Sequence, residues 1–248
     1  MTEHYGSALV TGASTGIGGK LAERLRAKGL EVHAIARDGA KLEALAQRTG
    51  AIPHAIDLGD TAALEAELGG LEIDVLANIA GVSRMGNVLD SSREDIDALV
   101  DINLTAVLHL VRILLPGMIE RDRGHIVNIS SIAGHYNFFG HTAYHAAKAA
   151  VHQLSRQIRN DTLGKRIRVT EISPGRVETE IFGRNLGGSP EALAEAHATY
   201  FEGYEALQTD DVANAIEFAL DSPPHMNVGL IEVMPTFQVP GGLTFDRH

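Results

Sequence analysis

Three polar residues of the sequence have the types and the spacing of an acid–base site. Tyr144 and Lys148 stand four positions apart, and Ser131 precedes both of them. Positions i and i+4 share one face of a helix, so the phenol and the ammonium can enter the same pocket. A neighbouring cation lowers the pKa of a phenol from about 10 towards neutral pH. The trio therefore predicts a general acid/base, and the plain alternative is a surface tyrosine and lysine beside a turn serine.

The elements around this trio alternate between short apolar strands and helices. Ile126 to Ser130 is expected as a strand that delivers Ser131 to the carboxyl end of a sheet, and Tyr144 to Thr162 as a helix. Continuous apolar strands between helices are typical of a parallel sheet covered on both faces. The sequence thus predicts a doubly wound α/β fold. Its other strands are expected at residues 7–11, 31–36, 51–57, 73–78, 168–172 and 229–234.

A glycine-rich turn follows the first of these strands and precedes a helical stretch. Gly12 permits a tight turn, Gly16 lets the backbone approach a phosphate, and Gly18 lets the helix pack close to the strand. Free N–H groups at the start of the helix favour a pyrophosphate. The turn predicts dinucleotide binding, with a purely structural strand-to-helix turn as the alternative.

The end of the second strand bears on the choice of dinucleotide. An acidic residue there normally holds the ribose 2′-hydroxyl of NAD, but this chain has Ala36 followed by Arg37. A planar guanidinium suits a 2′-phosphate, so NADP is favoured over NAD. We expect the neighbouring Asp38 to cap the next helix rather than to hold the ribose.

Two further polar residues have two interpretations each, and one stretch of small residues suits a ligand. Asp57 could accept a hydrogen bond from an adenine amino group or could cap a turn. Asn103 interrupts the apolar face of a helical segment, where it either bonds a neighbouring carbonyl and distorts the helix or holds a water near the active site. The stretch 78–81 ends a strand in small residues, against which a flat ligand can lie.

Two segments outside the regular pattern are expected to act on the substrate and on assembly. Residues 179 to about 204 contain three glycines before Pro190 and predict a mobile lid, partly helical from Pro190 onward; an ordinary surface connection is the alternative. The C-terminal tail, 235–248, carries Phe237 and Phe245, so we expect it to dock on a neighbouring subunit.

Composition narrows the class of partner. The 248 residues carry a formal net charge of −11 and have no basic run, which argues against nucleic acid and anionic membranes. There is no cysteine, no secretory leader and no long unbroken apolar run, and a cytoplasmic protein is expected. The histidines lack a metal-binding pattern, so no metal is predicted. His135, Tyr136 and His141 are instead expected at the mouth of the substrate site.

Taken together, these motifs resemble the short-chain dehydrogenase/reductase family over nearly the whole chain. They occur in the family's order: the turn from Thr11 to Gly18, then Asp57, Asn78-Ile79-Ala80-Gly81, Asn103, Ser131, Tyr144 with Lys148, and Pro174-Gly175 followed by Thr179. Ile79 departs from the pattern, since the family more often has a second asparagine there. The resemblance implies a single Rossmann-like domain over residues 1–248, assembled as a homotetramer or a homodimer.

The resemblance also implies roles for individual residues. Tyr144 would exchange a proton with the substrate oxygen and Ser131 would polarise that oxygen, while Lys148 lowers the tyrosine pKa and binds the nicotinamide ribose. Asn103 would hold a water for the proton relay, and Thr179 would bind the nicotinamide carboxamide. The cofactor-binding set implied as a whole comprises Gly12, Ser14, Thr15, Gly16, Ile17, Gly18, Arg37, Asp57, Leu58, Asn78, Ala80, Gly81, Tyr144, Lys148, Pro174, Gly175, Val177 and Thr179.

The expected function is an NADP(H)-dependent oxidoreductase that interconverts an alcohol and its carbonyl compound. Within the family, the 230–238 ending and the Ala36-Arg37 pair look like the group acting on small 3-hydroxy acids and related aldehydes. Arg176, Arg184 or a histidine of the 135–141 loop could bind a small anion. One rival is a reductase of a bulkier ketone or a 3-oxoacyl thioester, and a second is a catalytically idle NADP-binding sensor.

Overall fold

A computed structural model describes residues 4–203 and 205–239 of the chain. Residue 204, at the end of the predicted lid, lies outside this range. Most of the predicted tail, including Phe245, also lies outside it.

The described residues form one parallel sheet of seven strands in the order β3-β2-β1-β4-β5-β6-β7. Each predicted strand is present, with ends that differ from the prediction by a few residues. The strands are β1 Ser7–Thr11, β2 Glu31–Ala36, β3 Ile52–Ala55, β4 Val75–Asn78, β5 Gly124–Ile129, β6 Ile167–Pro174 and β7 Leu230–Val233.

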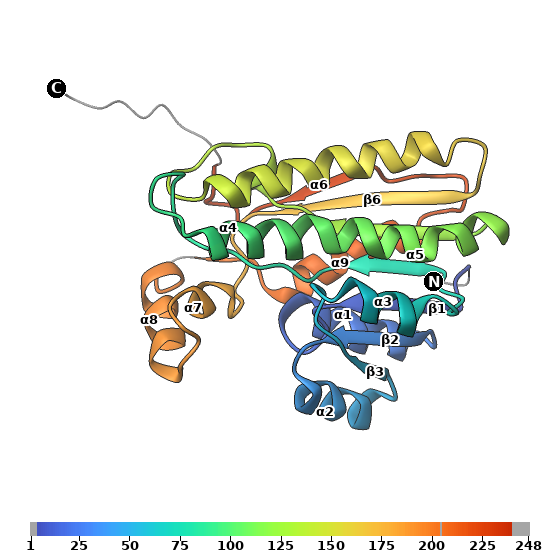
Figure 1. Cartoon of the computed structure of the whole chain (residues 1–248), viewed down its shortest axis with the longest axis horizontal. Helices are drawn as coiled ribbons and strands as arrows, with labels where there is room; N and C mark the ends of the chain where they lie inside the picture. The colour runs from blue at the N-terminus through green and yellow to red at the C-terminus, as the bar shows by residue number, and fades with distance from the viewer. Residues whose placement is uncertain (1–3, 204, 240–248) are drawn as a thin grey trace.

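Helices connect the strands and cover both faces of the sheet (Figure 1). The last turn of α4 continues through the π-helix η1 into α5. A single turn of 3₁₀ helix, η2, follows β5. The helices are α1 Gly16–Ala27, α2 Gly39–Thr49, α3 Thr61–Leu68, α4 Arg93–Val100, η1 Asp101–Thr105, α5 Ala106–Glu120, η2 Ile132–Gly134, α6 Thr142–Asp161, α7 Ile181–Asn185, α8 Pro190–Tyr200 and α9 Thr209–Asp221.

Alternate side chains of each central strand enter two separate apolar layers. In β1, Ala8 and Val10 pack with α1, α2 and α9, whereas Leu9 packs on the opposite face with α3, α5 and α6. Because successive strand residues point to opposite faces, a strand buried on both sides favours apolar residues at every position. This explains the apolar runs Ala8–Val10 and Val75–Ala77, whereas β5 and β6 also bury polar residues such as His125 and Glu171. The two layers confirm the predicted doubly wound α/β fold.

The order of the strands fixes where a ligand can bind. The chain runs outward from β1 through β2 to β3 and then crosses to β4 on the other side of β1. At this reversal the connections leave the sheet in opposite directions and open a crevice beyond the carboxyl ends of β1 and β4. The predicted glycine-rich turn and the Asn78–Gly81 stretch both begin at this crevice.

The helical segment Arg93–Glu120 is, within the described part of the chain, long and apolar enough to cross a membrane by length and composition alone, since an 18-residue window of it has a mean hydropathy of 1.8. In the fold it lies along the sheet. Leu110, Leu114 and Met118 of this segment are buried in the layer that contains α3 and α6. Packing against the sheet therefore accounts for much of its apolar character.

Candidate active site

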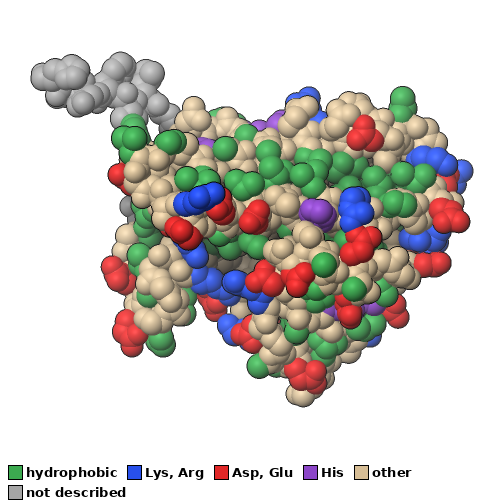
Figure 2. All heavy atoms as spheres, in the orientation of Figure 1, with side chains coloured by type: hydrophobic (Ala, Val, Ile, Leu, Met, Phe, Trp, Pro, Cys, Tyr) green, Lys and Arg blue, Asp and Glu red, His purple; other side chains and the backbone are tan. Residues whose placement is uncertain are grey.

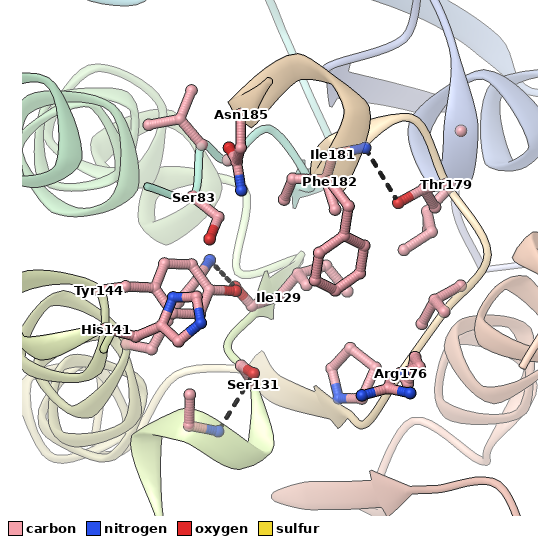
Figure 3. Close-up of a pocket in the computed structure, with 18 of the residues that line it drawn as sticks. Ser83, Ile129, Ser131, His141, Tyr144, Arg176, Thr179, Ile181, Phe182 and Asn185 are labelled. Atoms are coloured by element: carbon pink, nitrogen blue, oxygen red, sulfur yellow. Dashed lines mark hydrogen bonds between the residues drawn. The ribbon is translucent and has the colours of Figure 1, made fainter. Parts of the chain in front are cut away.

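A cavity of about 450 Å³ opens at the carboxyl end of the sheet. Ser131, Tyr144 and Lys148 line it together with the glycine-rich turn after β1. Ser131 lies two residues after the end of β5, and α6 presents Tyr144 and Lys148 on one face, one turn apart. The structure thus brings the three predicted residues into one site (Figure 3).

Ser131 and Tyr144 both line the cavity (Figure 3). The Ser131 side chain lowers the pKa of Tyr144, but burial of the ring has the larger effect and raises that pKa. The Ser131 oxygen also accepts a hydrogen bond from the backbone N–H of Ala133, at 3.1 Å. The serine side chain is therefore held in place by the first turn of η2 and faces the phenol.

Lys148 is almost fully buried, at 3% exposure. Its ammonium donates to the carbonyl oxygen of Ile129 at 2.9 Å and lies 5.7 Å from the centre of the Tyr144 ring. Burial lowers the pKa of Lys148 to about 8. A lysine held in this way can lose or gain a proton close to neutral pH.

Lys148 was predicted to lower the pKa of Tyr144, but in the protein without cofactor this pKa is raised. Burial of the ring raises it, and the Ser131 side chain opposes this effect. The ammonium lies near the face of the ring and bonds a backbone carbonyl. Sequence spacing correctly placed the two side chains on one helical face but could not show that both lie in a poorly solvated site, where charged forms are disfavoured.

Asn103 is buried, and both polar atoms of its side chain are hydrogen-bonded to backbone groups. Its amide nitrogen donates to the carbonyls of Leu99 and Val82, and its oxygen accepts from the Val82 N–H. The residue lies in the π-helix η1, so of the two predicted alternatives the structure shows the bonded carbonyl and the distorted helix. The same oxygen and the Lys148 ammonium both approach Gly81, whose added Cβ would lie 2.8 Å and 3.5 Å from them.

The glycine-rich turn has the shape of a phosphate cradle. A Cβ on Gly18 would lie 2.5 Å from the carbonyl oxygen of Gly12, so only glycine allows α1 to begin this close to β1. Thr15 precedes α1 without capping it through its side chain, which leaves helix N–H groups free to bind an anion. These residues therefore fit the predicted dinucleotide.

The predicted 2′-phosphate site lies beside this turn. Arg37 is exposed and borders the crevice, together with Lys41 and Asp57. Asp38 caps α2 by accepting from the N–H of Lys41 at 3.0 Å, as predicted. Asp57 accepts from the N–H of Gly59 at 2.9 Å and so stabilises a turn. Arg37 and Lys41 supply positive charge where a 2′-phosphate would lie.

A short lobe formed by α7 and α8 closes the opposite side of the cavity (Figure 1). The residue range predicted as the lid includes both helices of this lobe. Helix α8 begins at Pro190 as predicted, whereas the sequence analysis missed α7. Figure 2 shows Lys and Arg side chains gathered at the hollow between this lobe and the main body. Arg37, Arg84, Arg176 and Arg184 are among the residues that line it.

The substrate side of the cavity contains three of the five predicted residues. His141, Arg176 and Arg184 line it. His141 lies beside Tyr144, with ring centres 6.4 Å apart, and burial lowers its pKa. Arg184 donates to Thr15 and Glu180, which ties the lid to the glycine-rich turn.

His135, Tyr136 and Asn78 lie elsewhere. His135 bonds the buried carboxylate of Glu171, and the Tyr136 hydroxyl donates to Glu232 at 3.4 Å; neither residue lines the cavity. The Asn78 side chain instead donates to Asn128 within the sheet. The other residues predicted to bind the cofactor line the crevice.

Ser83, Arg84 and Asn185 line the cavity but were missed by the sequence analysis. Arg84 donates to the Asn185 oxygen at 3.2 Å and pairs with Asp95. The polar pair Ser83-Arg84, two residues after Gly81, was the available signal, since it lies close to the end of a central strand.

Comparison with known proteins agrees with this geometry. The model of the family described as short chain dehydrogenase matches residues 7–186. The chain is 36% identical to serine 3-dehydrogenase of Rhizobium radiobacter, covering 98% of this chain and 99% of the relative. It is also 36% identical to the NADP-dependent 3-hydroxy acid dehydrogenase YdfG of Salmonella typhi, covering 96% and 98%. A solved structure, the closed form of serine dehydrogenase complexed with NADP+, superposes with a TM-score of 0.92 at 34% identity over 97% of this chain and 99% of that one.

Proposed function

The chain belongs to the short-chain dehydrogenase family, and we propose that it interconverts a small 3-hydroxy acid and its carbonyl compound. As a member of this family it is an NADP-dependent oxidoreductase that acts on CH–OH groups. The choice of substrate is our inference. It rests on the polar residues around Tyr144 and on the relatives named above.

NADP fits the crevice described above. The free N–H groups of α1 would hold the pyrophosphate, and Arg37 with Lys41 would hold the 2′-phosphate. Gly81 and Thr179 would lie against the nicotinamide end, where both line the cavity. When bound, the nicotinamide supplies or accepts the hydride.

We propose that Tyr144 is the residue that moves the proton. Its hydroxyl faces the cavity beside Ser131, so a substrate oxygen placed between them can accept one hydrogen bond from the serine and exchange a proton with the phenol. Lys148 holds positive charge below the ring and touches the carbonyl of Ile129. Asn103 fixes the strand end at Gly81 against which the cofactor would lie.

The single observation that carries the substrate class is the pair of polar side chains on either side of the Ser131–Tyr144 pair. His141 lies beside the phenol, and its Nδ1 is buried with no hydrogen-bond partner in the described residues. Arg176, in the turn after β6, lines the same cavity, and its guanidinium donates to the carbonyl oxygen of Tyr200 at 3.1 Å. A small acid would place its carboxylate on Arg176 and its hydroxyl between Ser131 and Tyr144.

A substrate panel with a matched pair tests this proposal. We expect NADP+ reduction with 3-hydroxypropionate, 3-hydroxybutyrate or serine, and much weaker activity with the methyl ester of the best acid. Arg176→Gln should raise the KM for the acid roughly 10- to 100-fold, the cost of one charged hydrogen bond, while leaving the KM of the ester nearly unchanged. Faster turnover of the ester than of the acid would contradict the assignment.

One observation favours a second substrate class. Phe138, Phe139, Phe182 and Tyr200 also line the cavity, and an apolar wall of this kind suits a bulkier ketone or a 3-oxoacyl thioester. The same panel, extended with an aromatic ketone and an acetoacetyl thioester, separates the two. The third possibility, an idle NADP-binding sensor, predicts no turnover with any member of the panel.

Assembly is part of the proposal. Hydrophobic side chains gather over α5 and α6 in Figure 2, and Val100 and Leu108 of the α4–α5 segment are 38% and 45% exposed. We propose that this face forms a subunit contact of a homotetramer or a homodimer, and that the tail docks on a neighbouring subunit. Residues 179–204 act as the substrate lid in this proposal. Sedimentation analysis of the wild type and of Leu108→Glu checks the contact. A cytoplasmic location, checked by cell fractionation, completes the proposal.

A further inference from the structure

A second cluster of titratable side chains lies outside the residues that line the cavity. It consists of His135, His152 and Glu171. The His135 Nε2 lies 3.0 Å from one carboxylate oxygen of Glu171, and the His152 Nδ1 lies 2.6 Å from the other. The ligand atoms of all three residues lie within 4.8 Å of one another. Two imidazole nitrogens and the two oxygens of one carboxylate thus lie close together, one histidine at each oxygen.

Rigid elements hold these three side chains. Glu171 belongs to the central strand β6, His152 lies one helical turn after Lys148 on α6, and His135 directly follows η2. Ser130, at the end of β5, donates a hydrogen bond to the Glu171 oxygen that His135 also contacts. The cluster therefore joins the segment that carries Ser131 to the helix that carries Tyr144.

The buried charge of Glu171 also favours a bound cation. Its side chain is 1% exposed, and among the described residues its ion-pair partners are His135 and His152 alone, with no lysine or arginine. A buried carboxylate is costly unless a cation compensates its charge. The two histidines, 17% and 23% exposed, connect the cluster to solvent and so provide a path by which an ion can enter.

We propose that His135, His152 and Glu171 bind a divalent transition-metal ion of the zinc class. Two histidines and one glutamate are a known ligand set for zinc, with the fourth position left open. The ion would take its fourth ligand from water on the solvent side. Its charge would replace the compensation that Glu171 otherwise lacks, and its bonds would tie the Ser131 segment to α6. It would stabilise this arrangement and take no part in proton transfer.

Binding requires small rearrangements that the surroundings allow. Zinc bonds of about 2.0–2.1 Å place tetrahedral ligand atoms roughly 3.3 Å apart, so the present contacts of 2.6 Å and 3.0 Å must open by about 0.7 Å and about 0.3 Å. Each neutral imidazole must also move its proton to the ring nitrogen that does not bind the ion. For His152 that nitrogen faces the Arg156 guanidinium at 3.4 Å, so the exposed Arg156 must turn away. Arg156 therefore opposes the metal.

Metal titration of the full-length, untagged protein tests the proposal without relying on turnover. Co²⁺ should bind at one ion per chain and give the visible absorption of a four-coordinate site, and Zn²⁺ should displace it. His135→Gln and His152→Gln should each weaken binding at least tenfold, whereas His225→Gln, the same change at an exposed histidine, should not. Arg156→Gln should tighten binding severalfold, because it removes the competing cation. Circular dichroism and NADPH binding confirm that each variant is folded.

The opposite results would overturn the proposal. Equal Co²⁺ affinity in the wild type and both histidine variants would place the ion elsewhere. Binding only at millimolar Co²⁺ would reduce the cluster to a hydrogen-bonded network around Glu171.

Discussion

The two walls of the cavity are built in different ways. The wall formed by the strand ends is closely packed: a Cβ on Gly18 or on Gly81 would lie within 3 Å of neighbouring atoms, and Lys148 and Asn103 behind it are buried. The wall formed by α7 and α8 is closely packed only where the two helices meet, since a Cβ on Gly183 would lie 2.5 Å from Leu193. The connection between the two helices is open: Gly187, with φ of +103°, has no atom within 4 Å of an added Cβ, and Leu186 is 43% exposed.

This difference separates the two tasks of the site. The strand-end wall recognises a ligand through backbone N–H groups and fixed polar atoms, and substitutions there meet backbone. The lid wall recognises a ligand through side chains on short helices and their open connection, where replacements at exposed positions disturb few neighbours. The chemistry common to the family belongs to the first wall, and we assign the choice of substrate to the second wall together with His141 and Arg176.

The largest effect is expected at the phenol of the strand-end wall. Tyr144→Phe should lower kcat by about 10²- to 10⁴-fold, the usual contribution of a positioned acid/base. NADPH affinity should change less than about twofold, because the ring remains. Stopped-flow or steady-state NADPH absorbance and a fluorescence titration measure the two quantities. A variant with undiminished turnover would show that the proton moves through another group.

Lys148, in the same wall, makes the unfolding free energy of the protein depend on pH. Its pKa is lowered to about 8 by burial, so between pH 8 and pH 10 the unfolded chain binds a proton at this site that the folded chain has released. The unfolding free energy should therefore rise with pH across this window, by about 2–3 kcal/mol. Urea unfolding without cofactor measures it. Lys148→Met should abolish this rise, and Lys165→Met, at an exposed position, should retain it.

Cofactor choice tests the outer edge of the strand-end wall. Ala36→Asp combined with Arg37→Ile should weaken NADPH binding about 10- to 100-fold, since it removes a charged hydrogen bond and adds a repelling carboxylate. NADH binding should improve, because the new carboxylate can accept from the ribose 2′-hydroxyl. The ratio of kcat/KM for the two cofactors is the measurement. An unchanged ratio would mean that the 2′-phosphate lies away from Arg37.

A pair of methyl additions compares the walls directly. Gly18→Ala should cost about 1–3 kcal/mol of stability through overpacking and should weaken NADPH binding, because α1 must move away from β1. Gly187→Ala carries about 1–2 kcal/mol of backbone strain but meets no neighbour, so NADPH binding should be kept. Thermal unfolding and NADPH titration distinguish them. Equal losses of NADPH affinity would show that the lid is as closely packed as the strand ends.

The sequence by itself determined the parts of this protein that follow from local rules. Apolar runs longer than an alternating pattern allows marked strands buried on both faces, and glycines after β1 marked a turn that excludes a Cβ. Helical spacing placed Tyr144 and Lys148 on one face. Each of these depends on a short stretch of chain, so periodicity and residue type are sufficient.

Only the tertiary structure decided the features that depend on residues distant in the chain. Burial, rather than the charge of Lys148, sets the direction of the Tyr144 pKa. His135 belongs to the loop that was predicted to line the substrate site, yet its partner is Glu171, 36 positions later on a neighbouring strand. Side-chain direction and desolvation are set by packing between elements. A single sequence read along its length therefore identified the acid–base site but not the histidine–glutamate cluster near it.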